Sequence, residues 1–286
     1  MKILVIGASG MLGKPVTKAL VAAGFDITLL ARDVEKLKGL FPGTEIQKGD
    51  VLDKDSLITA MQGMDAVYCN LSVLPTAKDK DQHTEREGMD NIIAVAKQTG
   101  IRRIAYLSSL VHRYQGMNNF NWWAFGIKQQ AIQKIQACGI PYTIFYPSTF
   151  METYPFQMMR GNKIAMLGDS IMPMWFIAAD DYGKQVAASF HRLTHENRDY
   201  AVQGTEAFTF TDANKVFIHN YRKAKLTTMK APIGLMKCLG LFHQPFNYAW
   251  HICEALNKYP EKFESETTWE ELGKPVITLK DYAASL

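Results

Sequence analysis

The sequence has few of the features that mark secreted, metal-binding or membrane-spanning proteins. Its 286 residues contain four cysteines, and none of them has the Cys-x-x-Cys spacing typical of zinc and redox sites. Unpaired thiols in a chain of this length favour a reducing compartment, so we expect a cytoplasmic protein without a metal site. No leader precedes the first apolar run, and no run reaches the roughly 20 apolar residues that span a bilayer. We therefore expect no signal peptide and no membrane partner.

Charge of one sign is scarce as well. Lys and Arg number 32 against 28 Asp and Glu, which gives a net charge of +4 at pH 7. This excess is too small for the basic surface of a nucleic-acid-binding protein, so we expect no nucleic-acid partner. Apolar residues make up 47% of the chain, which excludes a disordered protein. The composition favours a small-molecule partner and leaves the oligomeric state open.

A glycine-rich turn near the N-terminus is the most informative feature that is present. The apolar run at residues 3–6 suits a buried parallel strand, and glycines 7, 10 and 13 lead from it into an amphipathic helix. The first glycine allows a positive φ, the second lets a phosphate approach the backbone, and the third lets the helix pack closely. The start of a helix then holds the pyrophosphate of a dinucleotide. The residues expected to bind it are Gly7, Ser9, Gly10, Met11, Leu12 and Gly13.

Apolar runs alternate with helical patterns through the first half of the chain. Strands are expected at residues 3–6, 26–31, 44–48, 66–70, 103–107 and 142–146. This alternation predicts a Rossmann-type, doubly wound parallel α/β sheet over residues 1–150, with ligands beyond the carboxyl ends of the strands. For residues 151–286 we expect a smaller α+β lobe for substrate or partner, partly interleaved with the sheet. Within it we expect a helix over 180–193 and helix caps at Thr211 and Thr278.

The end of the second strand bears on the choice of dinucleotide. Arg32 stands where an NAD enzyme usually places a carboxylate for the ribose hydroxyl. A guanidinium suits a 2′-phosphate, so the sequence favours NADP(H) over NAD(H). Asp33 remains open as a ribose ligand or as the cap of the next helix.

The Gly-x-x-Gly-x-x-Gly spacing resembles the extended and atypical short-chain dehydrogenase/reductase superfamily. The residues within and beside it resemble the NmrA-like and isoflavone-reductase-like branches, and Gly-Ile-Pro-Tyr-Thr at residues 139–143 is close to a sequence of the latter. The resemblance implies that Asp50 and Val51 contact the adenine and that Asn70 and Leu71 line the cofactor ribose. Asp50 could equally be a turn residue.

The same resemblance locates the catalytic groups and exposes a gap. Ser108 and Ser109 end the fifth strand, where the superfamily places its catalytic serine. Lys128 stands at the lysine of the usual Tyr-x-x-x-Lys pattern, where it would also bind ribose, but Ala124 replaces the tyrosine. In isoflavone-reductase-like relatives a lysine here is itself the acid–base group. In NmrA-like sensors, loss of the tyrosine accompanies loss of catalysis.

Two functions follow from this pattern. The first is an NADPH-dependent reductase of a small apolar carbonyl, enone or quinone, with Lys128 managing the proton. The second is a non-catalytic NADP(H)-binding regulator that acts through a protein partner. Four aromatic residues beside the lysine helix could wall a substrate pocket or pack in the core: Phe120, Trp122, Trp123 and Phe125. That helix is rich in Gln after Lys128 and lacks the acid that relatives often carry there.

Overall fold

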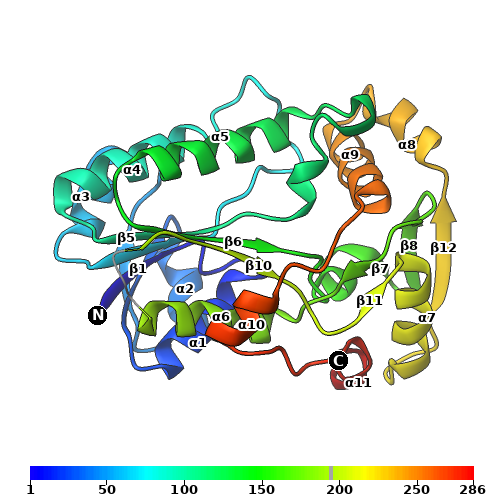
Figure 1. Ribbon diagram of the computed structural model, residues 1–286. Coiled ribbons are helices and arrows are strands. Elements are labelled where there is room, and N and C mark those ends of the chain that lie inside the picture. The colour runs from blue at the N-terminus through cyan, green and yellow to red at the C-terminus, as the bar shows by residue number, and fades with distance from the viewer. Residues whose placement is uncertain (193–195) are drawn as a thin grey trace.

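The computed structural model describes residues 1–192 and 196–286, and over these ranges seven parallel strands form one central sheet (Figure 1). The strand order is β10-β6-β5-β4-β1-β2-β3. The strands are β1 (Lys2–Ile6), β2 (Asp26–Ala31), β3 (Glu45–Lys48), β4 (Ala66–Cys69), β5 (Arg103–Leu107), β6 (Tyr142–Pro147) and β10 (Arg198–Val202). The order reverses at β1, which makes the carboxyl ends of β1 and β4 the expected place for a ligand.

Helices cover both faces of this sheet, which confirms the doubly wound α/β class (Figure 1). One face carries α3 (Lys54–Met61), α4 (Glu87–Thr99) and α5 (Trp123–Ala137); the other carries α1 (Gly13–Ala22), α2 (Val34–Leu40), α6 (Ala179–His191) and α10 (Glu266–Leu272). Each face buries its own apolar cluster. Packing is closest between α1 and α6, where a Cβ added at Gly183 would lie 2.9 Å from the Pro15 carbonyl oxygen.

The remaining elements form a lobe beside the carboxyl ends of the strands (Figure 1). In its described part, β9 (Met174–Trp175) pairs with β11 (Ala207–Phe208), and β8 (Lys163–Leu167) lies between β7 (Met159–Arg160) and β12 (Thr227–Ala231). The helical elements are η1 (Val111–Tyr114), η2 (Met117–Asn119), η3 (Tyr154–Met158), α7 (Phe210–Asn220), α8 (Ile233–Gly240), α9 (Gln244–Lys258) and α11 (Leu279–Ser285). A third apolar cluster stabilises the lobe, with the Tyr154 and Phe217 rings stacked at 4.1 Å.

Three features of the second half depart from the sequence-based expectation or refine it. The seventh strand, β10, was not predicted, because its sequence Arg-Asp-Tyr-Ala-Val opens with two charged residues. The Thr278 cap is confirmed, but the Thr211 cap is wrong: the Thr209 hydroxyl accepts from the Asp212 N–H, and α7 begins at Phe210. The helix expected over residues 180–193 is described as far as His191, and residue 193 lies outside the described residues.

Candidate functional site

Parallel pairing brings the carboxyl ends of the central strands to one side of the sheet, here called the carboxyl edge. Ile6 at the end of β1 is in register with Leu30 of β2 and Cys69 of β4, and Leu107 of β5 is in register with Phe145 of β6. The next residues along these strands therefore line one edge. They include Gly7, Arg32, Asn70 and Ser108, which the sequence singled out.

The glycine loop has the shape that a pyrophosphate needs. Gly7 has a φ of +85°, and a Cβ there would lie 2.1 Å from the Asn70 carbonyl oxygen; at Gly13 it would lie 2.0 Å from the Gly7 carbonyl oxygen. Only glycine fits at these two positions. Gly10 is exposed. A Cβ added there would have the Gly7 carbonyl oxygen as its nearest neighbour, at 3.3 Å. The loop thus closes on its strand side and stays open at Gly10.

The start of α1 carries no protein group that would compete with an anion. Leu12 occupies the N-cap position, and within the described residues no side chain caps the helix. The Lys14 N–H donates to the Gly10 carbonyl at 3.2 Å and Pro15 has no N–H, so this helix offers an anion its dipole and the backbone N–H groups that precede Lys14. Ser9 and Met11 lie half-buried beside them. These residues fit the diphosphate of a dinucleotide.

At the end of β2, Arg32 and Asp33 have different roles. The Asp33 carboxylate accepts from the Lys36 N–H at 3.1 Å and so caps α2, which is one of its two expected roles. Arg32 is exposed, and no residue in the described ranges forms an ion pair with it. Its guanidinium therefore remains available for an external anion.

The expected adenine and ribose residues have well-defined positions of their own. Asp50 Oδ1 accepts from the Leu52 N–H at 3.0 Å, so this side chain acts as a turn residue in the structure. Val51 is buried, and its carbonyl accepts from Asn91 Nδ2 at 3.0 Å. Asn70 Nδ2 donates to the Gly7 carbonyl at 3.4 Å, and Leu71 is buried. Their contacts with a cofactor remain predictions.

A buried acid–base cluster surrounds Lys128. Its Nζ lies 2.5 Å from Glu85 Oε1 and 3.4 Å from the Tyr106 hydroxyl oxygen. The Tyr106 hydroxyl donates to the same carboxylate oxygen at 2.7 Å. The side chain of Glu85 is only 1% exposed and that of Lys128 15% exposed. The ammonium is thus fixed by a buried carboxylate, on a side chain that is itself partly exposed.

Tyr106 cannot replace the missing catalytic tyrosine. Burial, and next the charge of Glu85, raise the pKa of Tyr106 well above its usual range. The Tyr106 hydroxyl donates its proton in a hydrogen bond to Glu85, and this bond fixes the position of the carboxylate. Ala124, at the usual tyrosine position, is 5% exposed.

Glu85 is the functional residue that sequence reasoning missed. It lies in the turn before α4, 43 residues before Lys128, and no motif or spacing links the two. The Gln-rich sequence of α5 indicates correctly that this helix supplies no acid to Lys128. The acid comes instead from the turn before α4, the helix beside α5 on the same face of the sheet.

The two serines differ in their surroundings. Ser108 is 5% exposed, and its Oγ is buried without a hydrogen-bond partner within the described residues. A buried hydroxyl without a protein partner is free to hydrogen-bond a group that enters the site. Ser109 is half-buried, and its carbonyl oxygen forms a short contact with His112 Nδ1. Burial lowers the pKa of His112 to about 4, so this imidazole is neutral at pH 7.

The aromatic residues beside the lysine helix pack into the protein. Phe120, Trp122 and Phe125 are all at most 6% exposed. Trp122 stacks on His251 at 5.2 Å and meets Tyr248 edge-on at 5.0 Å, so α9 covers it. Of the two expected roles, the structure shows core packing for these three residues. Trp123 is only half-buried, with its ring centroid 5.0 Å from that of His83.

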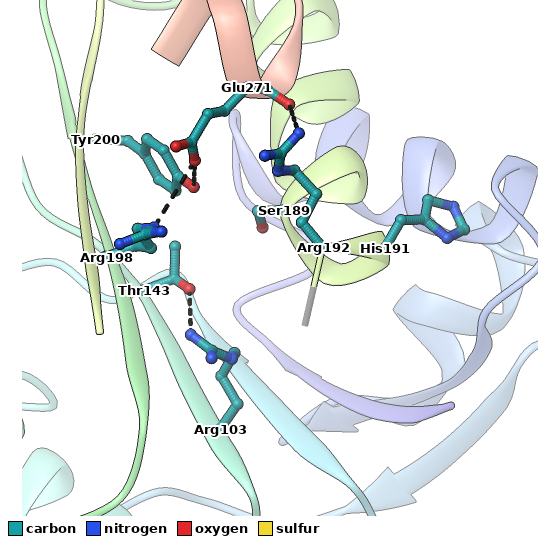
Figure 2. Close-up of a pocket in the computed structure, with 8 residues that line it drawn as sticks. All are labelled: Arg103, Thr143, Ser189, His191, Arg192, Arg198, Tyr200 and Glu271. Carbon is teal, nitrogen blue, oxygen red and sulfur yellow. Dashed lines mark hydrogen bonds and ion pairs between the residues drawn. The ribbon is translucent and has the colours of Figure 1, made fainter. Parts of the chain in front are cut away.

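The opposite side of the sheet, here called the amino edge, holds a cavity of about 340 Å³ (Figure 2). It lies where β5, β6 and β10 begin and where α6 ends. Among its lining residues are Arg103, Thr143, Arg192, Arg198, Tyr200 and Glu271. Elsewhere in the described residues, no cluster of potential metal ligands occurs, and no helix has both the length and the apolar character to cross a bilayer.

Known proteins support the reading of the carboxyl edge. Residues 7–169 match a family described as NAD(P)H-binding. A (4-alkanoyl-5-oxo-2,5-dihydrofuran-3-yl)methyl phosphate reductase from Streptomyces griseus is 30% identical over 72% of this chain and 69% of its own.

Two solved structures share the fold over nearly the whole chain. The triphenylmethane reductase of Citrobacter sp., complexed with NADP(H), has a TM-score of 0.77 and 19% identity and covers 100% of both chains. The NADPH-dependent quinone oxidoreductase of Escherichia coli, complexed with NADPH, has a TM-score of 0.76 and 20% identity and covers 99% of both chains. With its glycine loop, its sheet and the family match over more than half its length, the chain belongs to the NAD(P)H-binding family, within the short-chain dehydrogenase/reductase superfamily that its sequence resembles.

Proposed function

We propose that this protein is a cytoplasmic, NADPH-dependent reductase of a small apolar carbonyl, enone or quinone. The observation that carries the proposal is the ion pair of Lys128 with buried Glu85 at 2.5 Å, at the edge of the sheet where the glycine loop lies. A lysine on its own at this position would be an ordinary helical residue. A buried carboxylate holds the ammonium in one place, and a fixed position is one requirement of proton transfer to a bound acceptor.

The chain has residues for each part of NADP(H). The glycine loop with Ser9, Met11 and Leu12 would hold the diphosphate, and Arg32 would pair with the 2′-phosphate in preference to NAD(H). The other assignments follow the superfamily resemblance: Asp50 and Val51 at the adenine, Asn70 and Leu71 at the ribose. The Citrobacter reductase was solved with NADP(H) and the Escherichia coli oxidoreductase with NADPH, which supports this choice.

Proton handling follows from the chain's own groups. Bound NADPH would supply the hydride. Lys128 gives a proton to the oxygen of the reduced acceptor and regains one from water, which its 15% exposed side chain reaches. Glu85, held by the Tyr106 hydroxyl, keeps the Nζ in place throughout. Ser108, whose buried Oγ has no partner within the described residues, orients the carbonyl or the ribose, with Ser109 beside it.

One observation favours the second candidate, an NADP(H)-binding regulator without catalysis. Ala124 at the tyrosine position is buried, and Lys128 already has a full ionic partner. A dinucleotide could then bind without any group free to serve an acceptor. Such a protein would report the NADP(H) state to a partner through its C-terminal lobe.

Two measurements on one preparation separate the candidates. NADPH oxidation is followed across a panel of quinones, enones and aromatic ketones, and NADPH binding is titrated by calorimetry. Turnover with any class of acceptor supports the reductase. Tight binding with no turnover across the panel supports the regulator, and absence of binding contradicts both.

A further inference from the structure

The first turn of α5 brings the acid–base cluster together with Ala124, which stands at the usual tyrosine position. Lys128 follows Ala124 by four residues on the same helical face, and helical side chains point back toward the N-terminus, so the lysine stem extends toward Ala124. The ring centroids of Trp123 and His83 lie 5.0 Å apart, and Glu85 follows His83 by two residues. The lysine and its carboxylate therefore both lie close to the start of this helix.

A tyrosine of the C-terminal lobe approaches the same turn from α9. The Tyr248 ring meets the ring of Trp122, the residue before α5, edge-on at 5.0 Å, and α9 lies beside the start of α5 (Figure 1). Tyr248 packs against the apolar cluster that contains Ala124. Burial, and next the charge of Glu85, raise the pKa of Tyr248 to about 12, so the hydroxyl lies within the field of the buried carboxylate.

The Tyr248 hydroxyl is a donor that the protein does not use. Within the described residues it forms no hydrogen bond, whereas the Tyr106 hydroxyl donates to Glu85 at 2.7 Å. Tyr248 is half-buried, and its oxygen is not among the fully buried polar atoms that lack a partner, so it is open to an incoming molecule. Since its pKa is about 12, the hydroxyl keeps its proton at neutral pH.

Packing alone does not account for this hydroxyl. A phenylalanine would present the same ring edge to Trp122, and His251 of α9 already stacks on that indole at 5.2 Å. A hydroxyl that is partly removed from water and receives no protein partner costs free energy. A bound group with an acceptor oxygen offsets that cost.

We propose that Tyr248 is a catalytic residue that donates a hydrogen bond to the carbonyl oxygen of the acceptor. The inference rests on the proposed reductase function and adds a donor to it. When the acceptor carbon receives a hydride, the electron pair of the C=O bond moves to the oxygen. Tyr248 stabilises the negative charge there and keeps its own proton. Lys128 then gives a proton to the same oxygen, which ends as a hydroxyl, so α9 supplies the donor that Ala124 lacks.

Binding of 4-nitrophenol to the full chain in the presence of NADP⁺ tests the donor without turnover. The phenolate oxygen stands for the charged oxygen of the reduced acceptor, and the absorbance of the probe reports its ionised fraction. We expect the wild type to bind the phenolate. Tyr248→Phe should bind it about one to two decades more weakly, as for the loss of a hydrogen bond to a charged group.

A tyrosine elsewhere in the lobe gives the matched control. Tyr221 ends α7, stacks on Phe217 at 5.8 Å, and its hydroxyl likewise forms no hydrogen bond within the described residues. Helix α7 lies on the far side of the lobe from α5 (Figure 1). Tyr221→Phe should therefore bind 4-nitrophenolate as the wild type does.

Turnover and cofactor affinity give the second readout. With a quinone, enone or ketone, kcat of Tyr248→Phe at saturating NADPH should fall by a similar factor, while its calorimetric NADPH affinity stays at the wild-type value. Unchanged phenolate affinity in this variant would overturn the proposal, as would unchanged kcat or no phenolate binding by the wild type. An equal loss of NADPH affinity would assign Tyr248 a structural role and overturn it too. If no acceptor is turned over but the phenolate result holds, the reductase proposal fails and Tyr248 remains the donor to a bound oxyanion.

Discussion

The two edges of the central sheet both carry polar residues, but they use them differently. At the amino edge, Arg103 Nη1 donates to the Tyr142 carbonyl and to Thr143 Oγ1, both at 2.9 Å, and the Tyr200 hydroxyl donates to Glu271 at 2.6 Å. His191 and Arg192 stand at the end of α6, where cations offset the helix dipole. These groups are engaged with the protein itself.

The carboxyl edge leaves its polar groups available. Arg32 has no ion pair within the described residues, Ser108 Oγ has no hydrogen-bond partner there, and the N-terminus of α1 has no side-chain cap. The amino edge has a cavity of about 340 Å³, yet the carboxyl edge has the unused donors. A cavity alone is therefore a poor guide to the site in this fold, and unsatisfied polar groups are the better one.

The largest expected effect comes from Lys128→Met, which keeps the length of the stem and removes the charge. If Lys128 is the acid of a reductase, kcat at saturating NADPH should fall about 10²–10⁴-fold. Lys134→Met is the matched control, because Lys134 lies on the same helix and pairs with Asp90 away from the cluster. Full turnover in the Lys128 variant would show that the proton comes from elsewhere, with water or Ser109 as the next candidates.

Gly10→Val should nearly abolish NADPH binding while the strand and helix still form. The branched side chain fills the open side of the loop, and losing two or more charge-assisted hydrogen bonds costs about 10²-fold or more in affinity. Calorimetric titration measures the loss. Gly39→Val is the control, since a Cβ at Gly39 meets no atom within 4 Å. Unchanged affinity in the Gly10 variant would remove the basis of the cofactor site.

Arg32→Ala should change the coenzyme preference. A bidentate guanidinium–phosphate contact contributes about 1.5–3 kcal/mol, so NADPH affinity should fall by about one to two decades while NADH affinity changes little. Lys36→Ala, one helical turn further on and also exposed, should alter neither. Equal losses for both coenzymes would return NAD(H) as the favoured cofactor.

A half-buried carboxyl at the carboxyl edge should make stability depend on pH. Glu261 accepts from Ser148 Oγ at 2.9 Å and Gln203 Nε2 at 2.7 Å, and burial raises its pKa to about 7. The folded state therefore holds this proton at pH values where the unfolded chain, with a pKa near 4.5, has released it. The contribution is complete below about pH 4.5 and is lost as the pH rises to about 7.

Glu261→Gln should flatten that dependence. Thermal unfolding of the wild type should occur a few degrees lower at pH 8 than at pH 5, about 2–4 °C per kcal/mol, and the variant should show a smaller difference. Glu264→Gln, half-exposed and paired with Arg113 at 2.8 Å, is the neighbouring control. The same pH slope in both variants would mean that another group titrates.

The smallest effect is expected at the amino edge. Tyr200→Phe removes the hydroxyl that donates to Glu271 and should lower the free energy of unfolding by about 0.5–1.5 kcal/mol. NADPH affinity and kcat should stay at the wild-type values. A change in NADPH affinity or in kcat would show that the two edges are coupled, and would contradict a purely structural role for the amino edge.

The parts of the site that the sequence predicts are those fixed by local chemistry. The glycine loop can be predicted from Gly7, Gly10 and Gly13. Gly7 has a positive φ, and a side chain at Gly7 or Gly13 would clash with a backbone carbonyl oxygen. The alternation of strands and helices predicts the sheet because buried parallel strands are continuously apolar. The family match and the sheet topology confirm this reading.

The parts that it misses depend on contacts between distant residues. Glu85 looks like any polar loop residue until the fold sets it against Lys128 and Tyr106. The strand β10 opens with charged residues because Arg198 pairs with Glu196 and Glu271 at the amino edge, and a local pattern cannot show this. The cap of α7 was misplaced by two residues because Thr209 and Thr211 are equally plausible by type.

The close packing of α6 on α1 has a consequence for how the chain matures on the ribosome. Helix α1, which follows the glycine loop, is complete by residue 22. The helix that packs on it, α6, brings Gly183 against Pro15 much later in the sequence, and the sheet gains its last strand at residues 198–202. A nascent chain must therefore be more than two-thirds synthesised before the loop is fully supported. Until then the outer side of β6 and the back of α1 stay open to chaperones, and NADPH can favour the folded form only after that late closure.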